Sequence, residues 1–306
     1  MAHHDRTRIA GYRHILGGLG QFSVIGSVYL LTHAESPRDV AFWVVLVGGG
    51  VATSLMMGGV WFVRERASHR TRGARKPTGA FRDVIGNRHL RRLVTIYFFE
   101  ISAVAAIGLL ASFVCEYVVG NEGLFPLLLL VFQIASYVST PLVVRLSRGL
   151  GKKRVWMACM SLQACGFAAT AAAGAGDEFY LLACMALVGL GATGSMVLGM
   201  SIMADVVDYD ELRSGERKEA LHYAAINIAR KVSFASVSAL VGLAMESIGF
   251  EPNAHQTPET VAGLSALFAG IPAVALVVGI VLLVPFGLTE SEHAKVRAEL
   301  DARHAD

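Results

Sequence analysis

Charged side chains are scarce in this sequence of 306 residues: Asp, Glu, Lys and Arg make up 17% of it, and hydrophobic residues make up 54%. A water-soluble domain carries about 25% charged residues, so the shortage excludes an ordinary soluble protein. The mean hydropathy is +0.52. These apolar residues need a solvent other than water, which indicates a lipid bilayer.

Residue patterns typical of enzymes and metal sites are also missing. The four cysteines form no CxxC pair and no Cys/His spacing typical of zinc sites, so we expect them to be packing residues. Neither HExxH nor GxSxG occurs, so an enzyme is the least favoured class. The segment GLGATG (189–194) fits a dinucleotide fingerprint, but it lies inside an apolar run with no strand before it. We expect its glycines to allow close helix packing instead.

Long apolar runs dominate what is present. A membrane-spanning helix needs about 20 mostly apolar residues, and the sequence contains eight such runs. They lie at about 14–34, 40–63, 93–118, 124–144, 155–174, 179–204, 221–246 and 263–286. The runs are too long and too continuous for barrel strands. The sequence therefore predicts an all-α, polytopic helical membrane protein with about eight spans.

Lys and Arg are unevenly shared between the polar segments. The segment 64–92 holds ten of them against two acids, and the loop 145–154 holds five and no acid. The loops on the opposite side hold one Arg between them. Because cytoplasmic loops carry the excess of positive charge, we expect both termini in the cytoplasm and the chain in the plasma (inner) membrane. No cleavable signal-peptide pattern is visible at the start.

Two adjacent cations, Arg230 and Lys231, lie about midway along the run 221–246. A charge at this depth costs about 2.5–3.5 kcal/mol on insertion scales and normally faces a cavity or a partner. Tyr223 and Asn227 precede Lys231 at helical spacing and extend a polar stripe along the same face. We expect Lys231 to line a hydrated passage. The alternative is a buried ion pair, for which Glu100 is the one well-buried carboxylate.

The segment MADVVDYDELRSGERKEA (203–220) contains six acids, unlike the basic loops on the same side. It is predicted to be a loop that closes, as an ionic latch, against basic segments such as Arg145, Arg148 and Lys152–Arg154. A solvated charged turn is the alternative interpretation. The residues assigned to this cytoplasmic gate are Asp205, Asp208, Arg217, Arg145 and Arg148.

Several stretches resemble one family of membrane carriers. ADVVDYDELRSGERKEALHYAAINIARK (204–231) and the tail LTESEHAKVRAEL (288–300) are similar to the glycoside–pentoside–hexuronide cation symporters, the melibiose-carrier-like branch of the major facilitator superfamily. DRTRIAGYRHILGGLG (5–20) resembles the start of that family's fifth helix, NRHLRRLVTIYFF (87–99) its entry to the seventh, and RLSRGLGKKRVW (145–156) the loop between its eighth and ninth. The resemblance covers nearly the whole chain.

The resemblance implies twelve helices in two six-helix bundles, with the substrate between the bundles near the midplane. The chain would supply helices five to twelve. On this basis, 1–63 is the end of the N-terminal bundle, 64–92 a basic cytoplasmic linker, 93–286 the C-terminal bundle and 287–306 a cytoplasmic tail. The family's first four helices, which carry the acidic cation ligands, have no counterpart here.

The resemblance assigns roles to two residues. Lys231 matches a lysine near the family's cation site, and Arg13 matches an arginine that helps to bind sugar. Met196 stands where melibiose carriers have a tryptophan, which argues against a melibiose-like sugar.

The expected function is cation-coupled symport, with Na⁺ or H⁺, of a sugar or glycoside by alternating access. The expected partners are a small-molecule substrate and membrane lipid, with no nucleic acid and no cofactor besides the coupling cation. Two alternatives stay open. One is a related carrier of lipid or another solute. The other is a non-transporting fragment or subunit that needs a partner chain supplying the first four helices.

Overall fold

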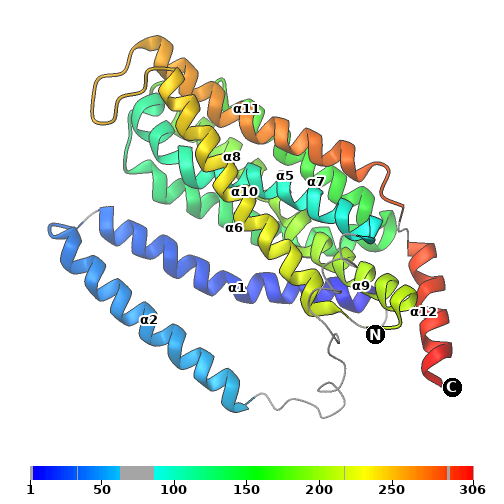
Figure 1. Ribbon diagram of the computed structural model, residues 1–306. Helices are drawn as coiled ribbons and strands as arrows, with labels where there is room; N and C mark the ends of the chain where they lie inside the picture. Colours follow the sequence, from blue (N-terminus) through cyan, green and yellow to red (C-terminus); the bar gives the residue numbers. More distant parts are fainter. Residues whose placement is uncertain (1–2, 33, 63–85, 217, 288–289, 306) are drawn as a thin grey trace.

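The structure, a computed structural model, describes residues 3–32, 34–62, 86–216, 218–287 and 290–305 (Figure 1). All regular elements within these ranges are helices, in agreement with the predicted all-α class. Their bounds are α1 His3–Thr32, α2 Pro37–Phe62, α5 Arg88–Phe113, η1 Val114–Val119, α6 Leu124–Leu150, α7 Lys152–Thr170, α8 Glu178–Thr193, η2 Gly194–Gly199, α9 Met200–Ser214, α10 Glu219–Ser247, α11 Pro258–Leu283 and α12 Glu290–Ala305.

Seven helical segments in the described part of the chain are long and apolar enough to cross a membrane. The run 155–174, expected as an eighth span, is the 19-residue helix α7, which is not among them. Its first turn carries Lys152, Lys153 and Arg154, which lower its hydropathy. Helix α7 nevertheless packs beside α8 and α11 within the bundle (Figure 1).

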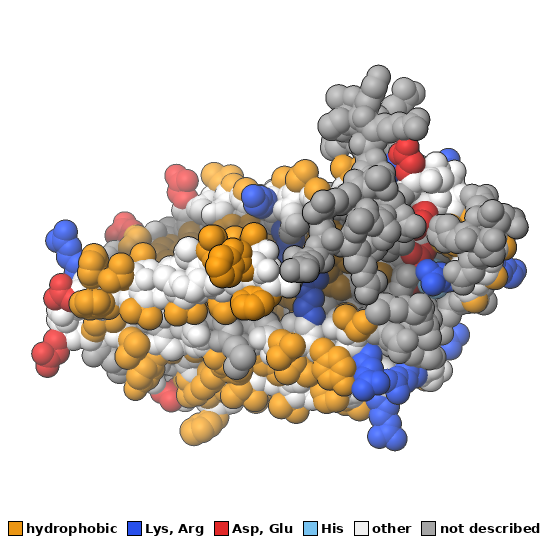
Figure 2. Space-filling model, turned by 90° about the horizontal axis from the view of Figure 1, so that it is seen from below, with side chains coloured by type: hydrophobic (Ala, Val, Ile, Leu, Met, Phe, Trp, Pro, Cys, Tyr) orange, Lys and Arg blue, Asp and Glu red, His pale blue; other side chains and the backbone are white. Residues whose placement is uncertain are grey.

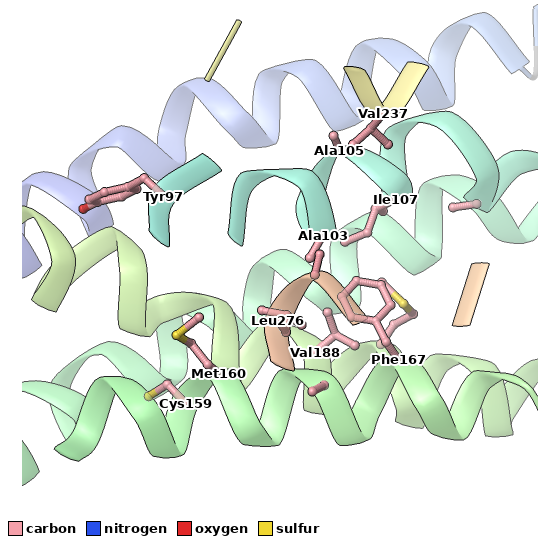
Figure 3. Packing of buried hydrophobic residues seen from close by; sticks show 14 of the residues in the cluster. Tyr97, Ala103, Ala105, Ile107, Cys159, Met160, Phe167, Val188, Val237 and Leu276 are labelled. Atoms are coloured by element: carbon pink, nitrogen blue, oxygen red, sulfur yellow. The ribbon is translucent and has the colours of Figure 1, made fainter. Parts of the chain in front are cut away.

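A buried apolar core joins α5, α7, α8 and α11 (Figure 3). Ile107 of α5, Phe167 of α7, Val188 of α8 and Leu276 of α11 are each no more than 3% exposed. In lipid, such contacts stabilise helix association through close packing, because the surrounding acyl chains are as apolar as the side chains. This core therefore sets the relative positions of the helices that carry the polar residues.

The glycines of GLGATG lie where α8 approaches its neighbours, as the sequence predicts. A Cβ atom on Gly189 would collide with the carbonyl oxygen of Phe132 on α6, and one on Gly191 with that of Cys159 on α7. A Cβ on Gly194 would lie 2.6 Å from the Cβ of Cys159. Small residues are required at these positions because two backbones lie next to each other.

The acidic segment 203–220, predicted to be a loop, is largely helical. Helices α8, η2 and α9 run on from one another to Ser214, and the connection to α10 is short. It begins at Gly215, whose φ of 71° is in the left-handed region favoured at helix C-termini. The loop prediction was wrong because the aspartates of α9 are buried against basic partners.

The ends of the C-terminal bundle also differ from the expected boundaries. Helix α5 begins at Arg88, before the expected position 93, because Asn87 caps it by accepting from the backbone N–H groups of His89 and Leu90. The tail contains α12, which lies against α9 near the C-terminus (Figure 1). Residues 64–85 of the expected linker 64–92 lie outside the described residues.

Helices α1 and α2 contribute little to the buried core. Helix α1 packs on α6, whereas α2 has no buried residue among those described. The face in Figure 2 carries hydrophobic side chains along its length and several Lys and Arg side chains toward the end where both termini lie. This distribution agrees with a multi-pass membrane protein.

Candidate functional site

A buried charged cluster lies at the end of α9. Asp205 is 4% exposed and Asp208 is fully buried. The ammonium group of Lys152 lies 2.6 Å from a carboxylate oxygen of Asp205. His293 Nε2 lies 3.1 Å from Asp208 Oδ2, and Arg297 Nη1 lies 3.7 Å from the same oxygen. Buried carboxylates need such partners, so the cluster ties α7 and α12 to α9.

The predicted latch is present in part: Lys152 of the basic segment pairs with Asp205, whereas Arg145 and Arg148 do not. Arg145 and Arg148 are exposed on α6, and neither forms an ion pair or hydrogen bond with any residue that the structure describes. Arg217 lies outside the described residues. The partners from α12, His293 and Arg297, were missed because more than eighty residues separate them from Asp208. The tail's mixture of charged and apolar residues is the signal that could have found them.

A second polar contact at the same end involves Asp210. Its Oδ1 accepts a hydrogen bond of 3.0 Å from the side-chain amide of Asn87, and its Oδ2 lies 3.8 Å from His222 Nε2. Asp210 therefore connects the start of α5 to the start of α10. With Asp205 and Asp208, it explains why α9 stays helical through its acidic segment.

Helix α10 turns its apolar side toward α5. Ile226, Ala229 and Val237 are buried on this side, and Ser233 is fully buried among them. The hydroxyl of Ser233 donates to the carbonyl oxygen of Phe98, at 2.9 Å. Ser233 follows Ala229 by four residues and Ile226 by seven, so all three lie on one side of the helix. This pattern could have indicated which side of α10 faces the bundle.

The predicted polar stripe lies on the other side of α10. Asn227 and Lys231 are exposed, and so is the neighbouring Arg230, whereas Tyr223 is half-buried. Neither Arg230 nor Lys231 has an ion pair or hydrogen bond within the described ranges. Both cations therefore project from the bundle about midway along a membrane-spanning helix.

Glu100 faces the inside of the bundle and not α10. Its side chain is 1% exposed, and the indole N–H of Trp156 on α7 lies 3.2 Å from each carboxylate oxygen. Among the described contacts Glu100 has no ion pair with Lys231. The alternative of a Glu100–Lys231 pair is thus not the arrangement in this structure.

A row of hydroxyl groups joins α1, α6 and α8. His14 Nε2 lies 3.1 Å from Ser136 Oγ, and Thr193 Oγ1 lies 2.6 Å from Ser139 Oγ. Thr193 also donates to the carbonyl oxygen of Ser136, at 2.6 Å. Arg13, the neighbour of His14, is exposed. The row was missed because single serines and threonines are common in membrane spans.

Replacing Thr193 with valine is expected to destabilise the protein by about 1 kcal/mol, a typical value for a hydrogen bond between membrane helices. The shape of the side chain stays nearly the same, but the contacts with α6 are lost. Thermal unfolding in detergent measures the change. Thr170→Val is the matched control, since buried Thr170 donates to its own helix, at Phe167. An equal loss in both variants would contradict a role in joining helices.

Comparison with known proteins places these features in context. Residues 2–290 match the family model described as MFS/sugar transport protein. An uncharacterized symporter, YjmB of Bacillus subtilis, is 28% identical over 97% of this chain and 65% of its own length. The glucuronide carrier protein homolog of Escherichia coli is 27% identical over 65% of this chain and 44% of its own length.

A putative sulfoquinovose importer of Escherichia coli is also similar, at 31% identity over 50% of this chain and 33% of its own length. The chain thus spans 65% or less of the length of these relatives.

Proposed function

This chain belongs to the MFS/sugar transport family, and from that premise we propose that it acts in secondary active symport of an anionic, sugar-like solute, coupled to Na⁺ or H⁺. The observation that carries the proposal is the exposed Lys231 midway along α10. A cation at membrane depth is stabilised by a hydrated passage and an anionic group. In alternating access, the passage opens in turn to each side of the membrane.

The names of the relatives support an acidic solute. Glucuronide and sulfoquinovose, the solutes named for two of these relatives, carry a carboxylate and a sulfonate, respectively. Arg230 and Lys231 supply positive charge for such a group. The half-exposed Met196 offers no aromatic surface for a neutral pyranose ring. The solute class proposed is therefore a sugar acid or sugar sulfonate.

A second candidate is a subunit or fragment that transports only with a further helical unit. It is favoured by the length of the relatives, of which the chain spans 65% or less. The absence of buried residues among those described in α2 also supports it. The additional helices would supply the carboxylates for the coupling cation.

Uptake by proteoliposomes tests both candidates. Vesicles containing this chain receive a labelled glucuronide, a labelled sulfonated sugar or a neutral methyl glycoside, with or without a sodium or proton gradient. Gradient-driven uptake of the acidic solutes is expected. Uptake at the same rate with and without the sodium and proton gradients would reject symport. If uptake appears only when a four-helix partner is co-reconstituted, the second candidate is correct.

Replacing Lys231 with glutamine is expected to lower uptake of an acidic sugar at least tenfold, corresponding to about 1.4 kcal/mol of lost interaction. The amide keeps most of the side-chain length but removes the charge. Initial uptake rates at equal protein density measure the effect. Lys295→Gln, at an exposed lysine of α12, is the control and is expected to stay within about twofold of the unmodified protein. Unchanged uptake in Lys231→Gln would refute the role assigned to this cation.

A further inference from the structure

A groove between the start of α1 and the end of α6 is not used by the proposed transport site. It encloses about 340 Å³. Three of its lining residues are arginines, Arg8 from α1 and Arg145 and Arg148 from α6, and none is acidic. It is therefore a site of concentrated positive charge built by two helices.

Arg145 and Arg148 lack the acidic partners that the predicted gate would have given them. Arg145 and Arg148 lie three residues apart, so they are neighbours on the same side of α6. Both side chains are exposed, and neither forms an ion pair or a hydrogen bond with any described residue. The helix dipole favours a basic residue in the last turn of a helix, which accounts for Arg148. It does not account for the third cation, Arg8, which comes from α1.

Tyr12 positions the cation of α1. Its hydroxyl accepts hydrogen bonds from Nε and Nη2 of Arg8, at 3.2 and 3.1 Å, and the guanidinium carbon lies 5.5 Å from the ring centre. Arg8 is thereby held beside the groove. The forked N–H groups of guanidinium side chains suit the oxygens of a phosphate.

The rest of the groove is apolar. Ile15 of α1 and Val144 of α6 line it, and the exposed side chains of Leu142 and Leu146 extend the apolar surface along α6. A ligand for this groove needs an anionic head beside a hydrocarbon body. Basic pockets between membrane helices on the cytoplasmic side bind anionic lipid headgroups. The distribution of Lys and Arg predicts that this end of the bundle faces the cytoplasm.

We propose that the groove binds an anionic phospholipid, with its phosphate among Arg8, Arg145 and Arg148 and its acyl chains along α6. The bound lipid links α1 to α6 at an end where no ion pair between these helices is present among the described residues. This proposal does not depend on which solute the protein transports.

Lipid titration of the purified protein in detergent tests the proposal. The added probes are phosphatidylglycerol, phosphatidylcholine with the same acyl chains, and inorganic phosphate. Native mass spectrometry counts bound lipid, and the melting temperature reports stabilisation. We expect phosphatidylglycerol to bind at least about tenfold more tightly than phosphatidylcholine and to raise the melting temperature. Equal binding of the two lipids would overturn the proposal. Competition by millimolar inorganic phosphate would instead identify a site for a free anion and would also overturn it.

The double variant Arg145→Gln/Arg148→Gln is expected to lose at least about tenfold in affinity for phosphatidylglycerol. The matched control is Arg154→Gln/Arg213→Gln, which removes the same charge from exposed arginines outside the groove. The control is expected to stay within about twofold. An equal loss in both double variants would indicate unspecific attraction and refute the site. Melting temperatures without lipid verify that each variant is folded.

Discussion

Replacing Lys152 with methionine is expected to destabilise the protein by about 3–5 kcal/mol, the range for removing one partner of a buried ion pair. Lys152 and Asp205 are both 4% exposed, and their charged groups lie 2.6 Å apart. Without the ammonium group, Asp205 loses its shortest ion pair, and His293 lies farther away, at 3.6 Å. The cost arises mainly from a carboxylate left in a place that water does not reach. Unfolding in detergent by a denaturant series measures it.

The double variant Lys152→Met/Asp205→Leu is expected to recover most of this loss, because no buried charge remains unpaired. Arg154→Gln is the control, since this exposed cation has no ion pair with any residue described. It is expected to change stability by less than about 0.5 kcal/mol. If Lys152→Met were as mild as the control, the buried pair would not hold α7 to α9.

Replacing Gly191 with alanine is expected to cost about 2–3 kcal/mol, near the upper end of the usual range for overpacking. The added methyl group would collide with the backbone carbonyl oxygen of Cys159 and would lie 2.8 Å from Gln163 Cβ and backbone N. Backbone atoms cannot turn aside as a side chain can. Relief therefore requires α7 and α8 to separate, which weakens the core around them.

Gly58→Ala on α2 is the matched control for this substitution. No atom lies within 4 Å of the position of its added methyl group. Alanine favours a helix over glycine by about 1 kcal/mol, so the control is expected to be neutral or slightly stabilising. Thermal unfolding of both variants in the same detergent compares them. A Gly191→Ala protein as stable as the control would show that α7 and α8 are not in close contact.

Helix packing was the feature of the site region that could be predicted best. Three glycines in GLGATG indicated close contact, and Gly189, Gly191 and Gly194 all lie against neighbouring helices. The prediction succeeded because glycine weakens a helix. Several glycines within one apolar helix therefore indicate a place where two backbones lie close together.

The charged residues were harder to place. Asp205 and Asp208 were predicted to lie in a loop that closes against basic segments including Arg145, Arg148 and Lys152–Arg154. They lie in a helix. Lys152 is a partner of Asp205, as predicted, and the remaining partners are His293 and Arg297 of α12. Loops and helix ends contain many cations, and sequence spacing does not tell which one meets a given carboxylate.

The sequence by itself determined that the protein is a helical membrane protein and where most of its spans lie, because hydropathy over about 20 residues is a local property. It also placed Lys231 at mid-depth. Only the tertiary structure decided which side of α10 is buried, that Glu100 faces Trp156, and that α12 completes the charged cluster on α9. Those outcomes depend on how helices distant in sequence rotate and pack against one another, and no local pattern fixes that rotation.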